Sequence, residues 1–242
     1  MKVYLNEMTG IADAITSMLM SKRSWTREKE EEIRNLVNRC TFRNGEINPN
    51  ASAEDLSEFM RQLNITLKWG KKHITLLRYI DFSFTVEGLH RAGQDDWDSH
   101  AQRFNNRIVR SSTRLAKFNG TEKSDYYKDK VLHIDDLIQM GLISPMKESI
   151  EVNGTTYVYT TNGYVREDLK DNKDALRGLY TLDIPSNFIF KVNLTELAHV
   201  IKERDINSNA NPEVKELAEA IKQQINDWYS QIDTQLFYDI KN

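Results

Sequence analysis

The sequence of 242 residues contains a single cysteine, Cys40, so it can form neither an internal disulfide nor a cysteine-rich metal site. No apolar run is long enough to span a bilayer, and the N-terminal residues lack the pattern of a signal peptide. No GxGxxG motif and no glycine-rich phosphate loop is present, which argues against P-loop and dinucleotide-binding folds. These absences favour a protein of a reducing compartment, and we expect a cytoplasmic location.

An excess of charge of one sign is also lacking. Charged residues make up 29% of the chain and the formal net charge is -3, so there is no global attraction to nucleic acids or to an anionic membrane. No internal repeat is evident, and the length is sufficient to bury a core in one domain. We therefore expect a single domain over residues 1–242, without a nucleic-acid or membrane partner.

Hydrophobic periodicity gives a coarse map of the secondary structure. The expected elements are a short edge strand at 1–5, helices at 10–20, 27–40 and 52–67, a half-buried strand at 80–86, a helix followed by a loop at 91–114, a hairpin at 149–160 that turns at Asn153-Gly154, and helices at 193–204 and from 211 onward. No alternating series of strands and helices suggests a doubly wound parallel sheet. The map predicts an α+β fold, with helices packed on a small, mostly antiparallel sheet.

Arg204 is unexpected, because it places a charge where an apolar residue should be. Asn193 is the expected N-cap of this helix, and Glu196 completes a capping-box pattern. The buried stripe that follows at helical spacing consists of Leu194, Leu197, Ala198 and Ile201. Arg204 occupies the next position of the stripe, so its guanidinium must be paired or must point into a polar cavity. An arginine that reaches water from a frayed helix end is the alternative interpretation.

A second unusual feature is a row of arginines with helical spacing. The row comprises Arg103, Arg107, Arg110 and Arg114. Like charges on one helix face repel each other, so such a row is more easily kept if an anion neutralises it. The hydroxyl of the neighbouring Ser112 would complement arginine forks in binding a phosphate group. A solvated basic face paired with carboxylates is the alternative, as is an electrostatic footprint for nucleic acid.

The stretch from Ala175 to Val214 resembles the C-terminal core of the flavin-dependent thymidylate synthases. That family has an Ala-Arg pair that opens a strand-like segment, an asparagine that starts the next helix, an arginine that ends it, and then Ala-Gln-x-Glu. The corresponding residues are Arg177, Asn193, Arg204 and Ala210-Asn211-Pro212-Glu213. The resemblance implies that Arg177 contacts the substrate phosphate and that Arg204 is a catalytic residue that contacts the uracil.

Two other segments resemble the family with departures. Ser112-Thr113-Arg114 matches the closing Ser-x-Arg of the family's signature loop, which implies that Ser112 and Arg114 bind the nucleotide phosphate. At the start of that loop, Gln102-Arg103-Phe104 stands where the family has Arg-His-Arg, so Arg103 is the one arginine kept, at a shifted position. His73–Val86 parallels His-x-Thr-x-x-Glu-His and a Phe-x-Phe strand, with Arg78-Tyr79 in place of Glu-His. Tyr79 could stack on a flavin ring or could simply be an amphipathic strand residue.

The resemblance also implies a set of cofactor-binding residues. They are Tyr79, Arg103, Asn193 and His199. A lone histidine on a helix is more often satisfied by a neighbouring residue, which is the alternative for His199. The other histidines show no metal-ligand spacing, so we expect no metal, and Cys40 is expected to be a small core residue rather than a nucleophile. Residues 120–165 have no counterpart in the family and are expected to form an insertion.

The function implied by the resemblance is reductive methylation of dUMP to dTMP. Methylenetetrahydrofolate would supply the one-carbon unit, reduced FAD the hydride, and NADPH would regenerate the flavin. The family assembles as a homotetramer, which the resemblance implies here too. The altered motifs leave open a related flavoenzyme that modifies another pyrimidine nucleotide, and the Arg103–Arg114 row leaves open a nucleic-acid-binding protein.

Overall fold

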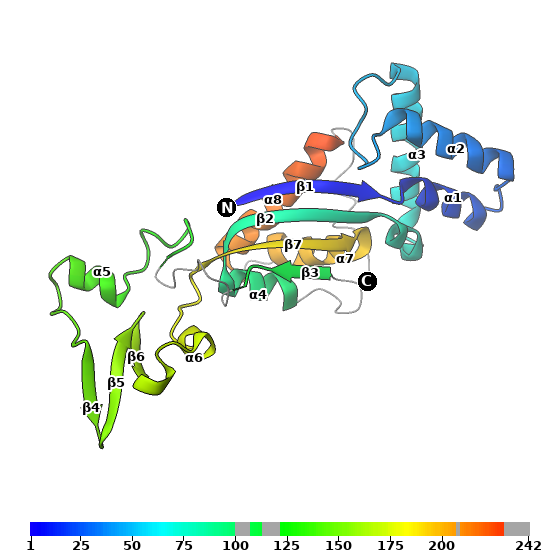
Figure 1. The fold of residues 1–242 in the computed structure, drawn as a ribbon. Coiled ribbons are helices and arrows are strands. Elements are labelled where there is room, and N and C mark those ends of the chain that lie inside the picture. Colours follow the sequence, from blue (N-terminus) through cyan, green and yellow to red (C-terminus); the bar gives the residue numbers. More distant parts are fainter. Residues whose placement is uncertain (100–106, 113–121, 207–208, 230–242) are drawn as a thin grey trace. The chain divides into compact units, whose positions relative to one another are not determined.

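The computed structural model describes residues 1–99, 107–112, 122–206 and 209–229 (Figure 1). The chain divides into two compact units. One, which we call the insertion unit, comprises residues 1, 87–94 and 110–187, and the other, the core unit, comprises residues 2–86, 95–109 and 188–242. Helices and an antiparallel sheet are both present, so the predicted α+β class is confirmed. The single domain over residues 1–242, with an insertion at residues 120–165, stays a prediction, and the name of the insertion unit refers to that expectation.

The core unit contains the main helices and most of the main sheet. Its elements are β1 (Lys2–Thr9), α1 (Ile11–Ser21), α2 (Arg27–Cys40), α3 (Ala53–Gly70), the 3₁₀ helix η1 (Ile74–Tyr79), α7 (Leu194–Ile201), the π-helix η3 (Lys202–Ile206) and α8 (Pro212–Trp228). Four elements run across the boundary between the units: β2 (Asp81–His90), α4 (Arg91–Ser99), β3 (Arg107–Arg110) and β7 (Pro185–Asn193). The sheet order is β1-β2-β7-β3.

Aromatic side chains from β2 and β7 build the centre of the core. The alternation predicted for β2 is confirmed, because Phe82, Phe84 and Val86 are fully buried. Phe84 stacks on Phe190 of β7 with ring centroids 5.2 Å apart. Such a pair adds directional stabilisation to the burial of apolar area, which aligns the two neighbouring strands.

The predicted helix boundaries are largely confirmed at the N-terminal caps. The Ser52 hydroxyl accepts from the Asp55 N–H of α3 at 3.1 Å, and the Asn211 side chain accepts from the Glu213 N–H of α8 at 3.0 Å.

Figure 1 shows α1, α2 and α3 gathered beyond the end of β1, with α8 alongside β1. Among the described ranges, no helix combines the length and the apolarity needed to cross a bilayer.

Cys40 is fully buried at the end of α2, as its place on the apolar stripe predicts. Burial raises the pKa of its thiol, which lowers the thiolate fraction at neutral pH. We therefore expect the native protein to react with a thiol reagent such as DTNB at least about tenfold more slowly than the denatured chain. A Cys40→Ala variant, which should show no labelling in either state, is the control, and rapid labelling of native protein would contradict the assignment.

The insertion unit has its own small sheet and short helices. Its elements are α5 (Ile134–Gln139), β4 (Ser149–Val152), β5 (Thr155–Thr160), β6 (Gly163–Arg166), the 3₁₀ helix η2 (Glu167–Leu169) and α6 (Lys173–Arg177). The predicted hairpin is confirmed, with Asn153 and Gly154 both at positive φ, 52° and 74°, as a type I′ turn requires. The third strand, β6, was not predicted, because the Thr161-Asn162 turn lacks glycine.

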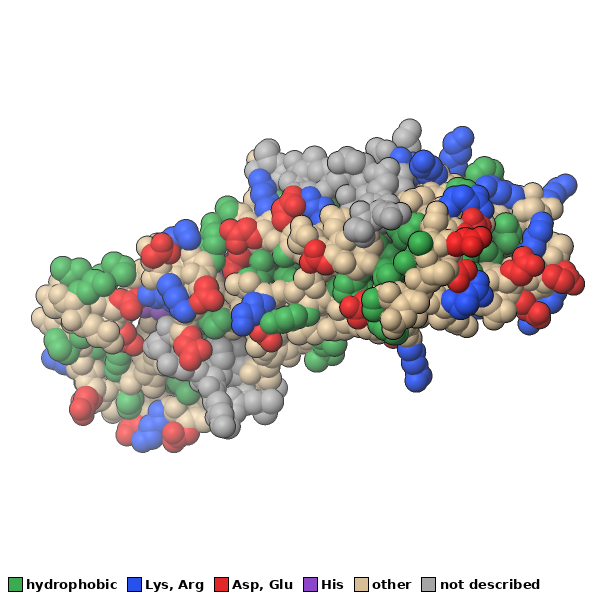
Figure 2. All heavy atoms as spheres, turned by 90° about the horizontal axis from the view of Figure 1, so that it is seen from above, with side chains coloured by type: hydrophobic (Ala, Val, Ile, Leu, Met, Phe, Trp, Pro, Cys, Tyr) green, Lys and Arg blue, Asp and Glu red, His purple; other side chains and the backbone are tan. Residues whose placement is uncertain are grey.

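The helix followed by a loop that was expected at residues 91–114 is confirmed as a helix over Arg91–Ser99 and is wrong at Arg107–Arg110. Arg107–Arg110 forms β3, where the β-branched Ile108 and Val109 favour a strand and β7 supplies the pairing edge. A strand repeats every two residues, so the spacing of Arg107 and Arg110 does not define one face, and the helical row is corrected at these two positions. Arg103 and Arg114 lie outside the described residues. Figure 2 shows basic and acidic side chains intermingled over the described part of the face in view.

Candidate active site

A small pocket in the insertion unit brings two arginines together. Its volume is about 140 Å³, and it is lined by Arg91, Arg177 and four residues of the segment 180–184. We call this segment the strap. Arg91 is the first residue of α4 and Arg177 is the last residue of α6. From the strap, Tyr180, Thr181, Leu182 and Ile184 form the remaining walls. A pocket of this size has room for a group of a few heavy atoms.

Backbone hydrogen bonds tie the strap to the start of α4. The Arg91 N–H donates to the Ile184 carbonyl at 3.0 Å, and the Ala92 N–H donates to the Leu182 carbonyl at 3.1 Å. The first N–H groups of a helix have no partner within the helix, so these contacts satisfy two of them. They also place the Arg91 side chain beside the strap.

Two guanidinium groups line the arginine pocket, those of Arg91 and Arg177. Arg177 contacts Asp174 at a long 3.4 Å, and both side chains are substantially exposed. The half-buried Arg91 donates to the amide oxygen of Gln94, also at 3.4 Å. Guanidinium groups that line one pocket suit an anion that can accept several hydrogen bonds.

Arg91 was missed by the sequence analysis, which sought phosphate ligands only where the family motifs place them. A signal was available, since Arg91 stands at a strand-to-helix junction directly after the buried strand residues of β2. Arg177 lies elsewhere than the resemblance implied. It ends the short helix α6 rather than opening a strand-like segment, because the Asn172 side chain caps that helix, and β7 begins only at Pro185.

Of Ser112 and Arg114, which the resemblance assigns to the nucleotide phosphate, the structure describes only Ser112. Ser112 follows β3 and is exposed. The preceding Ser111 is held by Asn187, whose carbonyl accepts both from the Ser111 N–H and from its hydroxyl, each at 2.8 Å. Arg103 and Arg114, which the sequence analysis assigned to cofactor and phosphate, lie outside the described residues.

In the core unit, Arg204 lies in a π-helical turn rather than in the α-helix that the sequence predicts. Helix α7 ends at Ile201 and the chain continues as the π-helix Lys202–Ile206. A π-turn inserts an extra residue and rotates the following side chains, and such turns are frequent at functional sites. Periodicity of 3.6 residues cannot reveal this change, so the predicted helix end at Arg204 is corrected.

The Arg204 side chain is buried and paired, which is one of the two states its position on the stripe demands. Its Nη2 donates to the Asp96 carbonyl at 2.8 Å, lies 2.8 Å from the Asp96 carboxylate, and contacts the Ser99 hydroxyl at 3.3 Å. Within the described residues these contacts all fall on Nη2, and the buried Nε has no hydrogen-bond partner. The α4 residues thus hold Nη2 of the guanidinium, while Nε has no acceptor among the described residues.

The three remaining predicted residues also lie in the core unit. Asn193 is the N-cap of α7, as predicted, and its side-chain oxygen accepts from the Glu196 N–H at 3.1 Å. His199 is half-buried in the middle of α7. Tyr79 is the last residue of η1 rather than a strand residue, and 49% of it is exposed.

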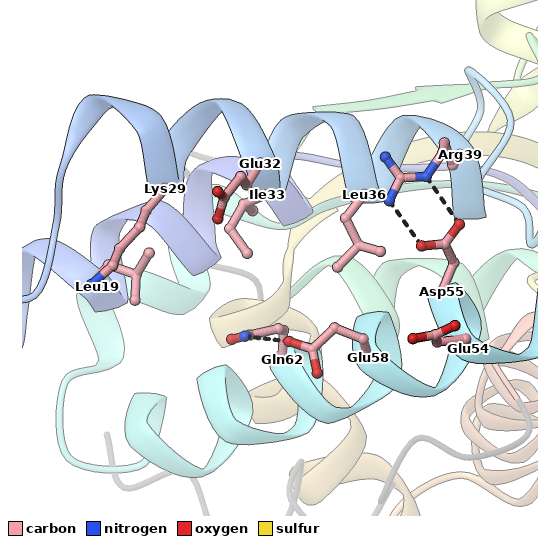
Figure 3. Close-up of a pocket in the computed structure, with 10 residues that line it drawn as sticks. All are labelled: Leu19, Lys29, Glu32, Ile33, Leu36, Arg39, Glu54, Asp55, Glu58 and Gln62. Atoms are coloured by element: carbon pink, nitrogen blue, oxygen red, sulfur yellow. Dashed lines mark hydrogen bonds and ion pairs between the residues drawn. The ribbon is translucent and has the colours of Figure 1, made fainter.

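A larger cavity of about 490 Å³ lies between α2 and α3 in the core unit (Figure 3). None of the predicted site residues lines it. Two of its carboxylates are already engaged, since Asp55 receives both hydrogen bonds of the Arg39 fork and Glu58 is bonded by Gln62. We therefore do not assign the candidate active site to this cavity. In the described part of the chain, no three potential metal ligands converge.

The described elements define an α+β protein, with helices packed on an antiparallel sheet. A family model described as thymidylate synthase complementing protein matches residues 16–229, which is most of the chain. The chain therefore belongs to that family, and the resemblance noted in the sequence is confirmed.

Solved structures agree in fold. The flavin-dependent thymidylate synthase from Helicobacter pylori, complexed with FAD and dUMP, has a TM-score of 0.54 to this chain at 14% identity, with 100% of both chains covered. A second structure of the enzyme from that organism, also with FAD and dUMP, has a TM-score of 0.54 at 13% identity and covers 98% of this chain and 100% of its own. No curated protein sequence is significantly similar to the chain.

Proposed function

We propose that this protein is a flavin-dependent thymidylate synthase that converts dUMP to dTMP. Methylenetetrahydrofolate would donate the one-carbon unit, FAD would carry the hydride, and NADPH would regenerate the reduced flavin. The observation that carries the proposal is family membership over residues 16–229. The resemblance of the segment from Ala175 to Val214 to the family's C-terminal core supports it. Detection of dTMP after incubation with all four reactants tests it, and the absence of dTMP would refute it.

Each arginine has a distinct role in the proposed reaction. Arg177 and Arg91 bind the 5′-phosphate from the two sides of their pocket, and Ser112 adds a hydroxyl donor. Arg204 donates to a uracil carbonyl through the edge of its fork that Asp96 does not occupy, and so stabilises negative charge that develops on the ring. The family's homotetramer is part of the proposal.

The residues at the proposed flavin site fit an aromatic cofactor. The exposed Tyr79 ring is available to stack on an isoalloxazine, while the oxygen of Asn193 is used in the helix cap, so a cofactor contact there falls to its amide nitrogen. His199, half-buried on the same unit, is the other described residue that the resemblance assigns to the cofactor. When bound, FAD supplies the hydride that the protein side chains cannot.

Purified protein incubated with FAD and then desalted is expected to retain a flavin spectrum that dUMP perturbs. Tyr79→Ala should weaken FAD binding by about tenfold through the loss of ring stacking, whereas Tyr79→Phe should retain it. Tyr4→Ala, which removes a similarly exposed ring from β1, is the matched control. Equal retention of FAD by Tyr79→Ala and wild type would exclude Tyr79 from the flavin site.

A second candidate function is a related flavoenzyme that modifies another pyrimidine nucleotide. The observation that favours it is Arg78-Tyr79, which replaces the Glu-His pair of the family. Turnover of dUMP should be compared with that of UMP and dCMP. Clear preference for dUMP removes this candidate, and preference for either of the others replaces the leading proposal.

A further inference from the structure

A buried polar contact links residues 123–136, which we call the inserted segment because they lie in the expected insertion at 120–165, to the strap. His133, directly before α5, has a side chain that is only 5% exposed, and its Nε2 lies 2.9 Å from an Asp183 carboxylate oxygen. The same nitrogen lies 3.2 Å from the Thr181 hydroxyl. Both partners belong to the strap, about 50 positions further along the chain, so tertiary folding alone brings them to His133.

The partners of His133 determine which of its nitrogens carries a hydrogen. An ionised carboxylate only accepts, so the contact with Asp183 assigns the hydrogen to Nε2, which shares it with the Thr181 oxygen. The Nδ1 atom is buried and has no hydrogen-bond partner among the described residues, which suits an unprotonated ring nitrogen better than a second N–H.

Further contacts hold the inserted segment around His133. The His133 N–H donates to the Asp136 carboxylate at 2.7 Å, and the Lys123 ammonium pairs with the same carboxylate. The Lys123 hydrogen bond, followed by that of the His133 N–H, lowers the pKa of Asp136, so its charge persists at neutral pH. On the strap, the Asp183 carbonyl accepts from the Ser124 N–H at 2.8 Å.

The strap is thus held on two sides. The inserted segment binds it through Thr181 and Asp183, while the start of α4 binds it through Leu182 and Ile184. The strap also forms the wall of the pocket that Arg91 and Arg177 share. A shift of this wall would change the separation of the two guanidinium groups, and anion binding by two forks depends on their geometry.

We propose that His133 is a positioning residue for anion binding. Through Thr181 and Asp183 it holds the strap in the place where Arg91 and Arg177 face a single phosphate group. The proposal rests on the proposed function only in taking that phosphate to be the one of the nucleotide substrate. It gives His133, which lies in the expected insertion at residues 120–165, a role in substrate affinity.

The test compares removal of each contact with its conservative replacement in the full chain. His133→Leu and Thr181→Val remove the contact, whereas His133→Gln keeps an N–H donor and Thr181→Ser keeps the hydroxyl. Affinity for inorganic phosphate is followed by phosphorus NMR and affinity for dUMP by calorimetry. The removal variants should bind both about tenfold more weakly, and the conservative variants should bind within about threefold of wild type.

FAD retention and the melting temperature are measured for every variant. A positioning role lowers anion affinity while both stay at the wild-type value, whereas a merely structural role lowers all three together. Wild-type affinity in both removal variants overturns the proposal, and so does a loss in all four variants that follows their melting temperatures. If His133→Leu does not fold, Thr181→Val decides, because valine replaces threonine at nearly equal volume. A wild-type protein that binds phosphate but not dUMP refutes the proposed substrate, while the comparison with phosphate still decides the role of His133.

Discussion

Replacement of Arg204 with alanine is expected to lower the rate of dTMP formation by at least about a hundredfold, with the fold retained. The guanidinium is buried and held by Asp96 and Ser99, so it is preoriented and needs no reorganisation during the reaction. The loss should appear in kcat more than in KM, because the charge on the uracil develops only in the transition state. Steady-state kinetics with circular dichroism of the variant measure both quantities.

Lys202→Ala is the matched control for Arg204→Ala. It removes the same charge from the same π-turn, but Lys202 is exposed, so we expect wild-type turnover. Asp96→Asn should give an intermediate loss, since it weakens the anchor of Arg204 without removing the guanidinium. Wild-type rates in Arg204→Ala would exclude Arg204 from the reaction.

The second large effect concerns substrate affinity. Arg91→Ala and Arg177→Ala are each expected to weaken dUMP binding by about tenfold to a hundredfold, the usual range for a hydrogen bond to a charged group. The two guanidinium groups line one pocket and would share one phosphate, so the double variant should lose less than the product of the single effects. Calorimetric titration of the two single variants and the double variant measures this coupling.

Lys173→Ala controls for the general loss of positive charge. Lys173 is exposed on the same short helix as Arg177 but does not line the pocket. Its replacement should leave dUMP affinity within about threefold of wild type, as expected for a screened surface charge. If Arg177→Ala weakens binding while Arg91→Ala does not, the shared pocket is not the phosphate site.

Sequence patterns predicted local elements well where the signal lies within a few residues. The caps Ser52, Asn193 and Asn211, the turn at Asn153-Gly154 and the apolar stripes all lie where they were expected. The two errors have different causes. Arg107–Arg110 has helical charge spacing yet forms a strand, because pairing with β7 outweighs a local preference. Arg204 lies in a π-turn, which a 3.6-residue period does not register.

The sequence by itself determined the class of the fold, the family and which arginines are unusual, because capping, periodicity and motif order are properties of neighbouring residues. Only the tertiary structure decided the partners of those arginines. Arg204 meets Asp96 across 108 positions, and His133 meets Thr181 across 48. Arg91 joins Arg177 in one pocket for the same reason. Such contacts depend on how the chain closes on itself, and a single sequence carries no local pattern that specifies them.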